Sequence, residues 1–155
     1  MMSRKIKVVA VAAGIVAAAS VAWPVAAQYA KPEDAVKYRK AAFTVMGSHM
    51  GRIFAQLKST TPDMRVIQTS AQTVESMSKL PWDAFAPNTE LVADTQALPA
   101  LFKNDAKAKE LAQKMQEEVS KLNTVAKSGD VAAIRTQFNA AAKSCDNCHD
   151  DFRAK

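Results

Sequence analysis

Glycine and proline are scarce in this sequence, which has 4 glycines and 6 prolines among its 155 residues. This scarcity excludes collagen-like and low-complexity chains, which are rich in both residues. Hydrophobic residues make up 48% and charged residues 23% of the chain, which is typical of a globular protein and not of a disordered one. The length fits one ordinary domain.

The sequence also lacks a basic surface suited to nucleic acid. The formal net charge is +6, but Arg4, Lys5 and Lys7 lie in the first seven residues, which contain no acid. From residue 28 onward, 18 basic residues face 15 acidic ones, and no cluster mixes Lys or Arg with aromatic residues. Such a cluster is needed to follow a phosphate backbone, so we expect no nucleic-acid partner.

The basic start is followed by an apolar run over residues 8–22. This run is shorter than the ~20 residues that cross a bilayer, and the small residues 25–27 after it suit signal peptidase. We therefore predict a cleaved signal peptide at residues 1–27, a mature domain at residues 28–155 and a periplasmic location. An uncleaved membrane anchor is the alternative, and after cleavage no membrane association is expected.

Two segments in the first half of the chain show helical periodicity. Residues 33–58 carry apolar side chains at steps of three, four and seven, and Pro32 suits the first position of this helix. The second helix is expected to start with Thr61 as its cap and Pro62 at its first position, and to stop before Pro81.

Two further helices are predicted in the second half. Asn104 is expected to cap a helix that runs to the Ser128–Gly129 break, and residues 131–152 form the most regular apolar stripe in the chain. Residues 81–103 contain three prolines and no sustained period, so we expect a long connection there. No strand pattern competes, and the sequence predicts an all-α, antiparallel four-helix bundle.

The two cysteines of the chain lie in the last stripe with the spacing Cys145-x-x-Cys148-His149. This spacing is the attachment pattern of c-type haem. On a helix, Cys145 and Cys148 share a face and can form thioethers with the two haem vinyl groups, while His149 can bind the iron. We therefore predict one covalent haem c near the C-terminus, with His149 as its protein metal ligand.

The Cys-x-x-Cys-His motif has three alternative interpretations. A thioredoxin-like redox pair normally lies at a helix start after a strand, whereas this pair lies near the end of the last helix. A zinc site would need four ligands, and only His49 remains to join the three motif residues. A structural disulfide within one helical turn would be strained.

The mature chain resembles the cytochrome c prime family of class II c-type cytochromes. The similarity is carried by QYAKPEDAVKYR at residues 28–39, LPWDAF at residues 80–85, and CDNCHD at residues 145–150 together with Arg153. It spans nearly all of the mature chain. In this family the haem lies near the C-terminus of a four-helix bundle.

The resemblance places Phe43 on the haem face opposite His149. Family members with five-coordinate iron have an apolar residue there, often leucine, and phenylalanine likewise has no lone pair to offer. This implies an open iron site that binds nitric oxide and carbon monoxide, with a second gas site if the His149 bond breaks. Ligation by Met46, Met50 or His49 remains an alternative.

The resemblance also implies roles for charged residues around the haem. Arg39 would pair with a propionate, although a solvated surface arginine is the alternative, and Lys40 stands where relatives often carry a glutamine near the propionates. Asp94 would lie near the haem edge. Arg153 would shape the proximal pocket, with an ordinary C-terminal helix cation as the alternative.

Two function classes follow from these residues. The first is a homodimeric gas-binding haem protein whose first two helices form the interface, and the second is a six-coordinate electron carrier that serves a periplasmic redox partner. An enzyme is not expected, because no distal His or Arg accompanies Phe43 to assist bond cleavage.

Overall fold

The computed structural model describes residues 29–155, so the predicted signal peptide at residues 1–27 lies outside the described residues. Four long helices make up the bundle: α1 (Pro32–Lys58), α2 (Met64–Met77), α4 (Asp105–Ala126) and α5 (Val131–Phe152). The described residues contain no β-strand and only one isolated β-bridge. The four long helices confirm the predicted all-α, antiparallel four-helix bundle. None of the helices in this part of the chain is both long enough and apolar enough to span a membrane.

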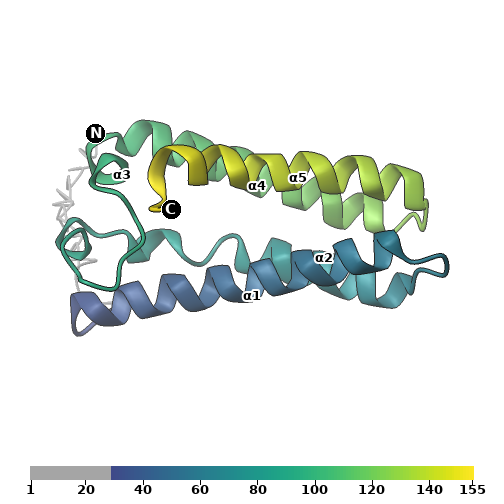
Figure 1. Cartoon of the computed structure of the whole chain (residues 1–155), viewed down its shortest axis with the longest axis horizontal. Coiled ribbons are helices and arrows are strands. Elements are labelled where there is room, and N and C mark those ends of the chain that lie inside the picture. Colours follow the sequence, from purple (N-terminus) through teal and green to yellow (C-terminus); the bar gives the residue numbers. More distant parts are fainter. Residues whose placement is uncertain (1–28) are drawn as a thin grey trace, which may run out of the picture.

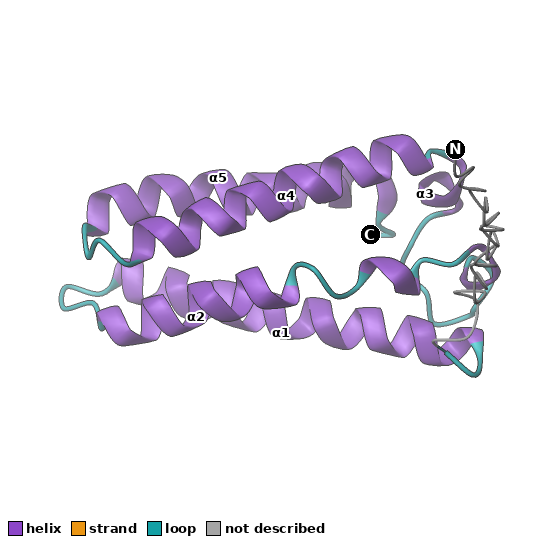
Figure 2. Cartoon of the chain, turned by 180° about the vertical axis from the view of Figure 1, so that it is seen from behind, coloured by secondary structure: helices purple, strands orange, loops and turns teal. Residues whose placement is uncertain are grey.

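The bundle has two layers. Figure 1 shows α1 beside α2 in one layer and α4 beside α5 in the other, and α2 also packs against α4. Figure 2 shows two short turns at one end of the bundle and the long connection at the other. Short turns force sequential helices to be antiparallel neighbours, as the sequence predicts.

The apolar stripes of all four helices meet in one core. Fully or nearly fully buried side chains come from each of them, including Ile53, Ile67, Val119, Leu122 and Ile134. Met46 belongs to this core at 5% exposure, and Met50 packs against it. The core therefore uses both methionines as packing residues, in the manner expected of methionine at helical spacing.

The start of α2 differs from the prediction. The predicted cap Thr61 and first-position Pro62 both precede the helix, and Asp63 is the N-cap. Its carboxylate accepts hydrogen bonds from the backbone N–H groups of Arg65 (2.9 Å) and Val66 (3.4 Å). An aspartate satisfies these unpaired amides at least as well as a threonine, so the helix starts two residues later.

The connection, residues 81–103, is more ordered than predicted. It contains two 3-10 turns, η1 (Trp82–Ala84) and η2 (Pro87–Thr89), and the five-residue helix α3 (Pro99–Lys103). Asn104 occupies the N-cap position of α4, but its side chain donates to the carbonyl of Ala100 in α3. The predicted cap position is therefore confirmed, but the Asn104 side chain forms no capping hydrogen bond and binds the preceding helix.

Candidate functional site

The predicted haem-binding motif lies in the last turns of α5. Cys145 and Cys148 are half-buried free thiols, and Cys145 packs against the hydrophobic core. His149 follows them on the same helix and is exposed. An aspartate, Asp130, caps the far end of α5 and accepts from two backbone N–H groups of its first turn. The helix therefore presents Cys145 at the boundary of the core, with the half-buried Cys148 one turn further on.

The protonation states of these groups argue against a dithiol redox site. Burial raises the pKa of Cys145, and Asp146 raises it further. Burial and then Asp151 act in the same direction on the pKa of Cys148. Redox-active pairs have the opposite property, because their attacking cysteine needs a lowered pKa.

His149 is shifted toward its neutral form. Partial desolvation of the ring and the positive charge of Arg153 lower its pKa, while Asp146 and Asp150 act in the opposite direction. A histidine binds a metal through its neutral imidazole, so this shift suits a ligand. Arg153 is the C-cap residue of α5, and its backbone N–H donates to the His149 carbonyl at 3.1 Å.

Arg39 of α1 is buried, at 3% exposure. Its Nη1 donates to the carbonyl of Ala84 and to the hydroxyl of Thr89, both at 2.7 Å, and its Nη2 donates to the hydroxyl of Thr95 at 2.6 Å. The guanidinium carbon lies 4.4 Å from the ring centroid of Phe85. The solvated-surface alternative for Arg39 is therefore wrong.

The partners of Arg39 leave its charge uncompensated. All three acceptors are neutral, and no carboxylate among residues 29–155 forms an ion pair with it. Desolvation by burial lowers the pKa of this guanidinium. A buried cation without a counter-ion is costly, and the fork of Arg39 still has donors to offer. The donor set thus fits an additional anionic group such as a haem propionate.

Lys40 and Asp94 lie together, although the sequence did not predict that they pair. The Nζ atom of Lys40 is 2.6 Å from the Asp94 carboxylate and 3.3 Å from its backbone carbonyl. The pair is solvent-exposed, so its contribution to stability is small. It joins the connection to the first half of α1.

Phe43 lies one helical turn after Arg39 in an aromatic cluster. Its ring meets those of Trp82 and Phe85 edge-on, with centroids 5.9 Å and 6.2 Å away. Trp82 and Phe85 stack on each other, and the Trp82 indole donates to the Ser78 carbonyl at 2.6 Å. The cluster contains no group that binds iron strongly, and it confirms that Trp82 and Phe85 pack under the connection.

His49, the alternative ligand from α1, contacts α2. It is half-buried between α1 and α2, with its Nδ1 atom 3.2 Å from the hydroxyl of the buried Ser70. The zinc alternative also has no support in residues 29–155, where no group of three or more Cys, His, Asp or Glu side chains is placed to hold a metal ion.

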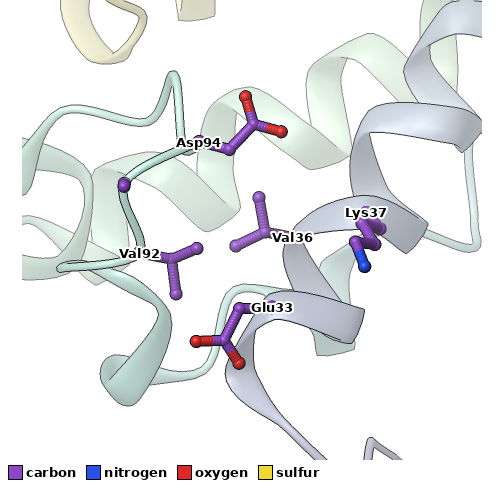
Figure 3. A pocket seen from close by; sticks show the side chains of 6 residues that line it. Glu33, Val36, Lys37, Val92 and Asp94 are labelled. Atoms are coloured by element: carbon purple, nitrogen blue, oxygen red, sulfur yellow. The ribbon is translucent and has the colours of Figure 1, made fainter.

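A shallow cavity of about 250 Å³ lies where the connection crosses the first turns of α1. Figure 3 shows Val36 of α1 and Val92 of the connection facing each other, with the carboxylates of Glu33 and Asp94 at the rim. None of the three motif residues lines this cavity, and it is smaller than pockets that hold drug-sized ligands. It is therefore a gap beside the connection and not the predicted cofactor site.

Comparison with known proteins decides the family. The family described as Cytochrome C' matches residues 34–153. The chain belongs to the cytochrome c prime family. It is 40% identical over 129 residues to the cytochrome c prime of Alcaligenes xylosoxydans xylosoxydans, covering 83% of this chain and 99% of that one. Members of this family bind haem c.

Solved cytochrome c prime structures share the fold. The nitric oxide complex of a single-residue variant from Alcaligenes xylosoxidans has a TM-score of 0.76 and 39% identity, covering 83% of this chain and all of that one. A carbon monoxide complex of another variant has the same values. A cytochrome c prime described as having a ligand-controlled dimer dissociation has a TM-score of 0.77 and 26% identity, covering 81% and 98% of the two chains.

The structure also reveals site residues that the sequence did not. Thr89 and Thr95 fix Arg39, and both come from the connection, where no periodicity indicates which side chains point inward. A polar residue in an irregular segment carries no signal of burial. The family resemblance pointed to this region through residues 80–85 and through Asp94, but it indicated neither threonine.

Proposed function

We propose that this cytochrome c prime binds one haem c through thioethers to Cys145 and Cys148, with His149 as the protein ligand of the iron. The sequence spacing and the half-buried position of both thiols support this assignment. The neutral form of His149, favoured by its surroundings, is the form that binds iron. Arg39, buried without an anionic partner among the described residues, is assigned to a propionate.

The proposed function is reversible binding of nitric oxide and carbon monoxide on the Phe43 side of the haem. When bound, haem iron supplies an open coordination position for a diatomic gas. The observation that carries the proposal is the aromatic cluster around Phe43, which offers no ligand. The relatives solved with nitric oxide and with carbon monoxide support the same proposed function, gas binding.

The residues of this site act as binding and excluding groups and not as catalysts. Phe43 limits the space available to a ligand, and neighbouring aromatic rings keep water away from that side. Within residues 29–155 the aromatic contacts of Phe43 are Trp82 and Phe85, and the nearby Arg39 is held by Ala84, Thr89 and Thr95. None of these groups is a general acid or base poised to move a proton. We therefore infer a binding protein and no enzyme.

Electron transfer by a six-coordinate haem is the competing function. It needs a donor atom from α1, and Met46 is the nearest methionine in sequence to Phe43. Its side chain is 5% exposed and packed in the core, so ligation would require it to leave that position and create a cavity. The packing therefore favours the open site, while electron exchange with a periplasmic partner is compatible with it.

Nitric oxide added to the ferrous mature holoprotein tests the proposal. We expect a clear change of the absorption spectrum. The variant Phe43→Met places a thioether where the ring was and should bind the gas at least roughly tenfold more slowly, a barrier change of about 1.4 kcal/mol. The variant Phe43→Leu is the matched control and should retain the response. An unmodified protein without a response would overturn the proposal.

We also propose export and dimer formation. The basic start and short apolar run support cleavage before Gln28 and a periplasmic location, which N-terminal sequencing of the exported protein tests.

For the dimer, the exposed Val45 and Phe54 of α1 and the related protein with a ligand-controlled dimer support an interface on the first two helices. Sedimentation equilibrium that gives only monomer would contradict the dimer.

A further inference from the structure

Thr95 joins two parts of the molecule that the sequence places far apart. Its hydroxyl accepts from Arg39 Nη2 of α1 at 2.6 Å and from the backbone N–H of Ala97 at 3.1 Å. The first contact fixes the connection to α1. The second fixes the turn that leads the chain toward the end of α5.

The segment after Thr95 is paired with the tail of α5. The N–H of Leu98 donates to the Phe152 carbonyl, and the N–H of Ala154 donates to the Gln96 carbonyl, both at 2.8 Å. These two bonds flank an antiparallel bridge between Ala97 and Arg153. Buried Phe152 anchors the pairing, at 4% exposure.

This pairing ends on the turn that carries His149. The backbone N–H of Arg153 donates to the His149 carbonyl at 3.1 Å. The last carbonyls of a helix have no partners within it, so a helix end frays unless other groups hold it. Here the connection holds that end through its pairing with residues 152–154, and Thr95 binds α1 directly beside this pairing.

We propose that Thr95 is a positioning residue that couples the Arg39 side of α1 to the turn of α5 that carries His149. The inference rests on the proposed function, in which His149 binds the haem iron. Loss of the Thr95 hydroxyl releases the connection from Arg39 at this point, and the Ala97–Arg153 pairing transmits that loss to the His149 turn. A coupling of this kind requires a demonstrated energetic effect at the distant end and not proximity alone.

Thr89 provides a matched control. Like Thr95, it accepts a hydrogen bond from the Arg39 guanidinium, at 2.7 Å, and it is completely buried. Its own hydroxyl donates to the Ala86 carbonyl and has no bond to the segment that pairs with α5. Removing the Thr89 hydroxyl therefore disturbs Arg39 without breaking the link through Ala97.

Hydrogen exchange of backbone amides in the holoprotein tests the coupling. In Thr95→Val, exchange at Leu98, Arg153 and Ala154 should rise roughly fivefold, the effect of one lost hydrogen bond. Thr95→Ser keeps the hydroxyl and should restore the original rates. Thr89→Val should leave the Arg153 amide unchanged. Amides of Val119 and Leu122 in α4 serve as the reference for global stability.

A spectroscopic readout reports on the histidine itself. The iron–histidine stretching frequency of the ferrous holoprotein should fall in Thr95→Val and remain unchanged in Thr95→Ser, because a looser turn holds the imidazole less firmly. A structural role confined to the connection would leave this frequency unchanged and would overturn the proposal.

Three exchange results would also overturn it. These are an increase confined to residues 92–97, an equal increase at Arg153 in Thr89→Val, and an increase that extends to Val119 and Leu122. The last result would show that Thr95 contributes to stability alone. Failure of the unmodified protein to bind nitric oxide would refute the gas-binding function, whereas the exchange data would still decide whether the coupling exists.

Discussion

Arg39 combines a full positive charge with almost complete burial. Its position on α1 follows from the helical period, but its burial depends on the connection folding over it. Three hydrogen bonds offset part of the cost of taking the guanidinium out of water. A propionate would supply the missing negative charge, which makes this residue central to both the fold and the proposed haem site.

Replacing Arg39 by lysine should destabilise the holoprotein. A lysine keeps the charge but cannot form the directional bonds to Ala84, Thr89 and Thr95 together, so we expect the free energy of unfolding to fall by about 2 kcal/mol. Urea denaturation measures the change. Arg52→Lys on the exposed face of α1 is the control, and equal effects of the two substitutions would contradict our view of Arg39.

The sequence predicted the positions of the motif residues better than their surroundings. Cys145, Cys148 and His149 occupy one helix, so their relative placement follows from helical geometry. The pairing of Lys40 with Asp94 depends on the path of the connection. The sequence of the connection shows no apolar periodicity from which this path could be predicted. Side chains brought together by an irregular segment were therefore beyond prediction from the residues alone.

The contact between α2 and α4 includes a polar pair at the edge of the core. The Glu75 carboxylate accepts a hydrogen bond from the Asn123 amide. Hydrogen bonds from Ser120 and Asn123 lower the pKa of Glu75 below its ordinary value of 4.5, against an opposing effect of burial. The ionised carboxylate is thus the form that stabilises the folded bundle.

Glu75→Gln should remove the stabilisation by the ionised carboxylate, and the loss of stability should depend on pH. Because the pKa is lower in the folded state, the stabilisation is present above the unfolded-state pKa and disappears as the pH falls through the folded-state value. We expect the substitution to cost about 1 kcal/mol at pH 7 and almost nothing at pH values below the folded-state pKa of Glu75. Urea denaturation between these pH values measures the loss of stability.

The exposed Glu117 of α4 provides the control for that experiment. Glu117→Gln should change the free energy of unfolding little. If the Glu75 and Glu117 variants show the same pH profile, the hydrogen bonds to Glu75 do not stabilise the contact between α2 and α4.

The ends of the helices show where sequence patterns are weakest. The apolar stripes predicted all four long helices, whereas the cap of α2 was assigned to Thr61 when Asp63 fills it. Both residues are good caps, so local chemistry alone did not choose between them. The short helix α3 was missed because five residues are too few to show a period.

The bundle as a whole was predictable because its topology is determined by short turns and apolar stripes. Short connections at one end leave only an antiparallel arrangement within each layer, and the long connection must then cross the opposite end (Figures 1 and 2). The motif at the end of α5 falls at this crossed end. What periodicity did not predict is the hydrogen-bonded path through Thr95 from one layer to the other.

The electron paramagnetic resonance spectrum of the ferric mature holoprotein at neutral pH tests the open haem site most directly. If His149 is the only protein ligand of the iron, the spectrum is that of a high-spin, five-coordinate haem. A low-spin spectrum accompanied by a methionine-to-iron charge-transfer band would contradict the account. It would show that a methionine of α1 occupies the Phe43 side and that the protein is an electron carrier.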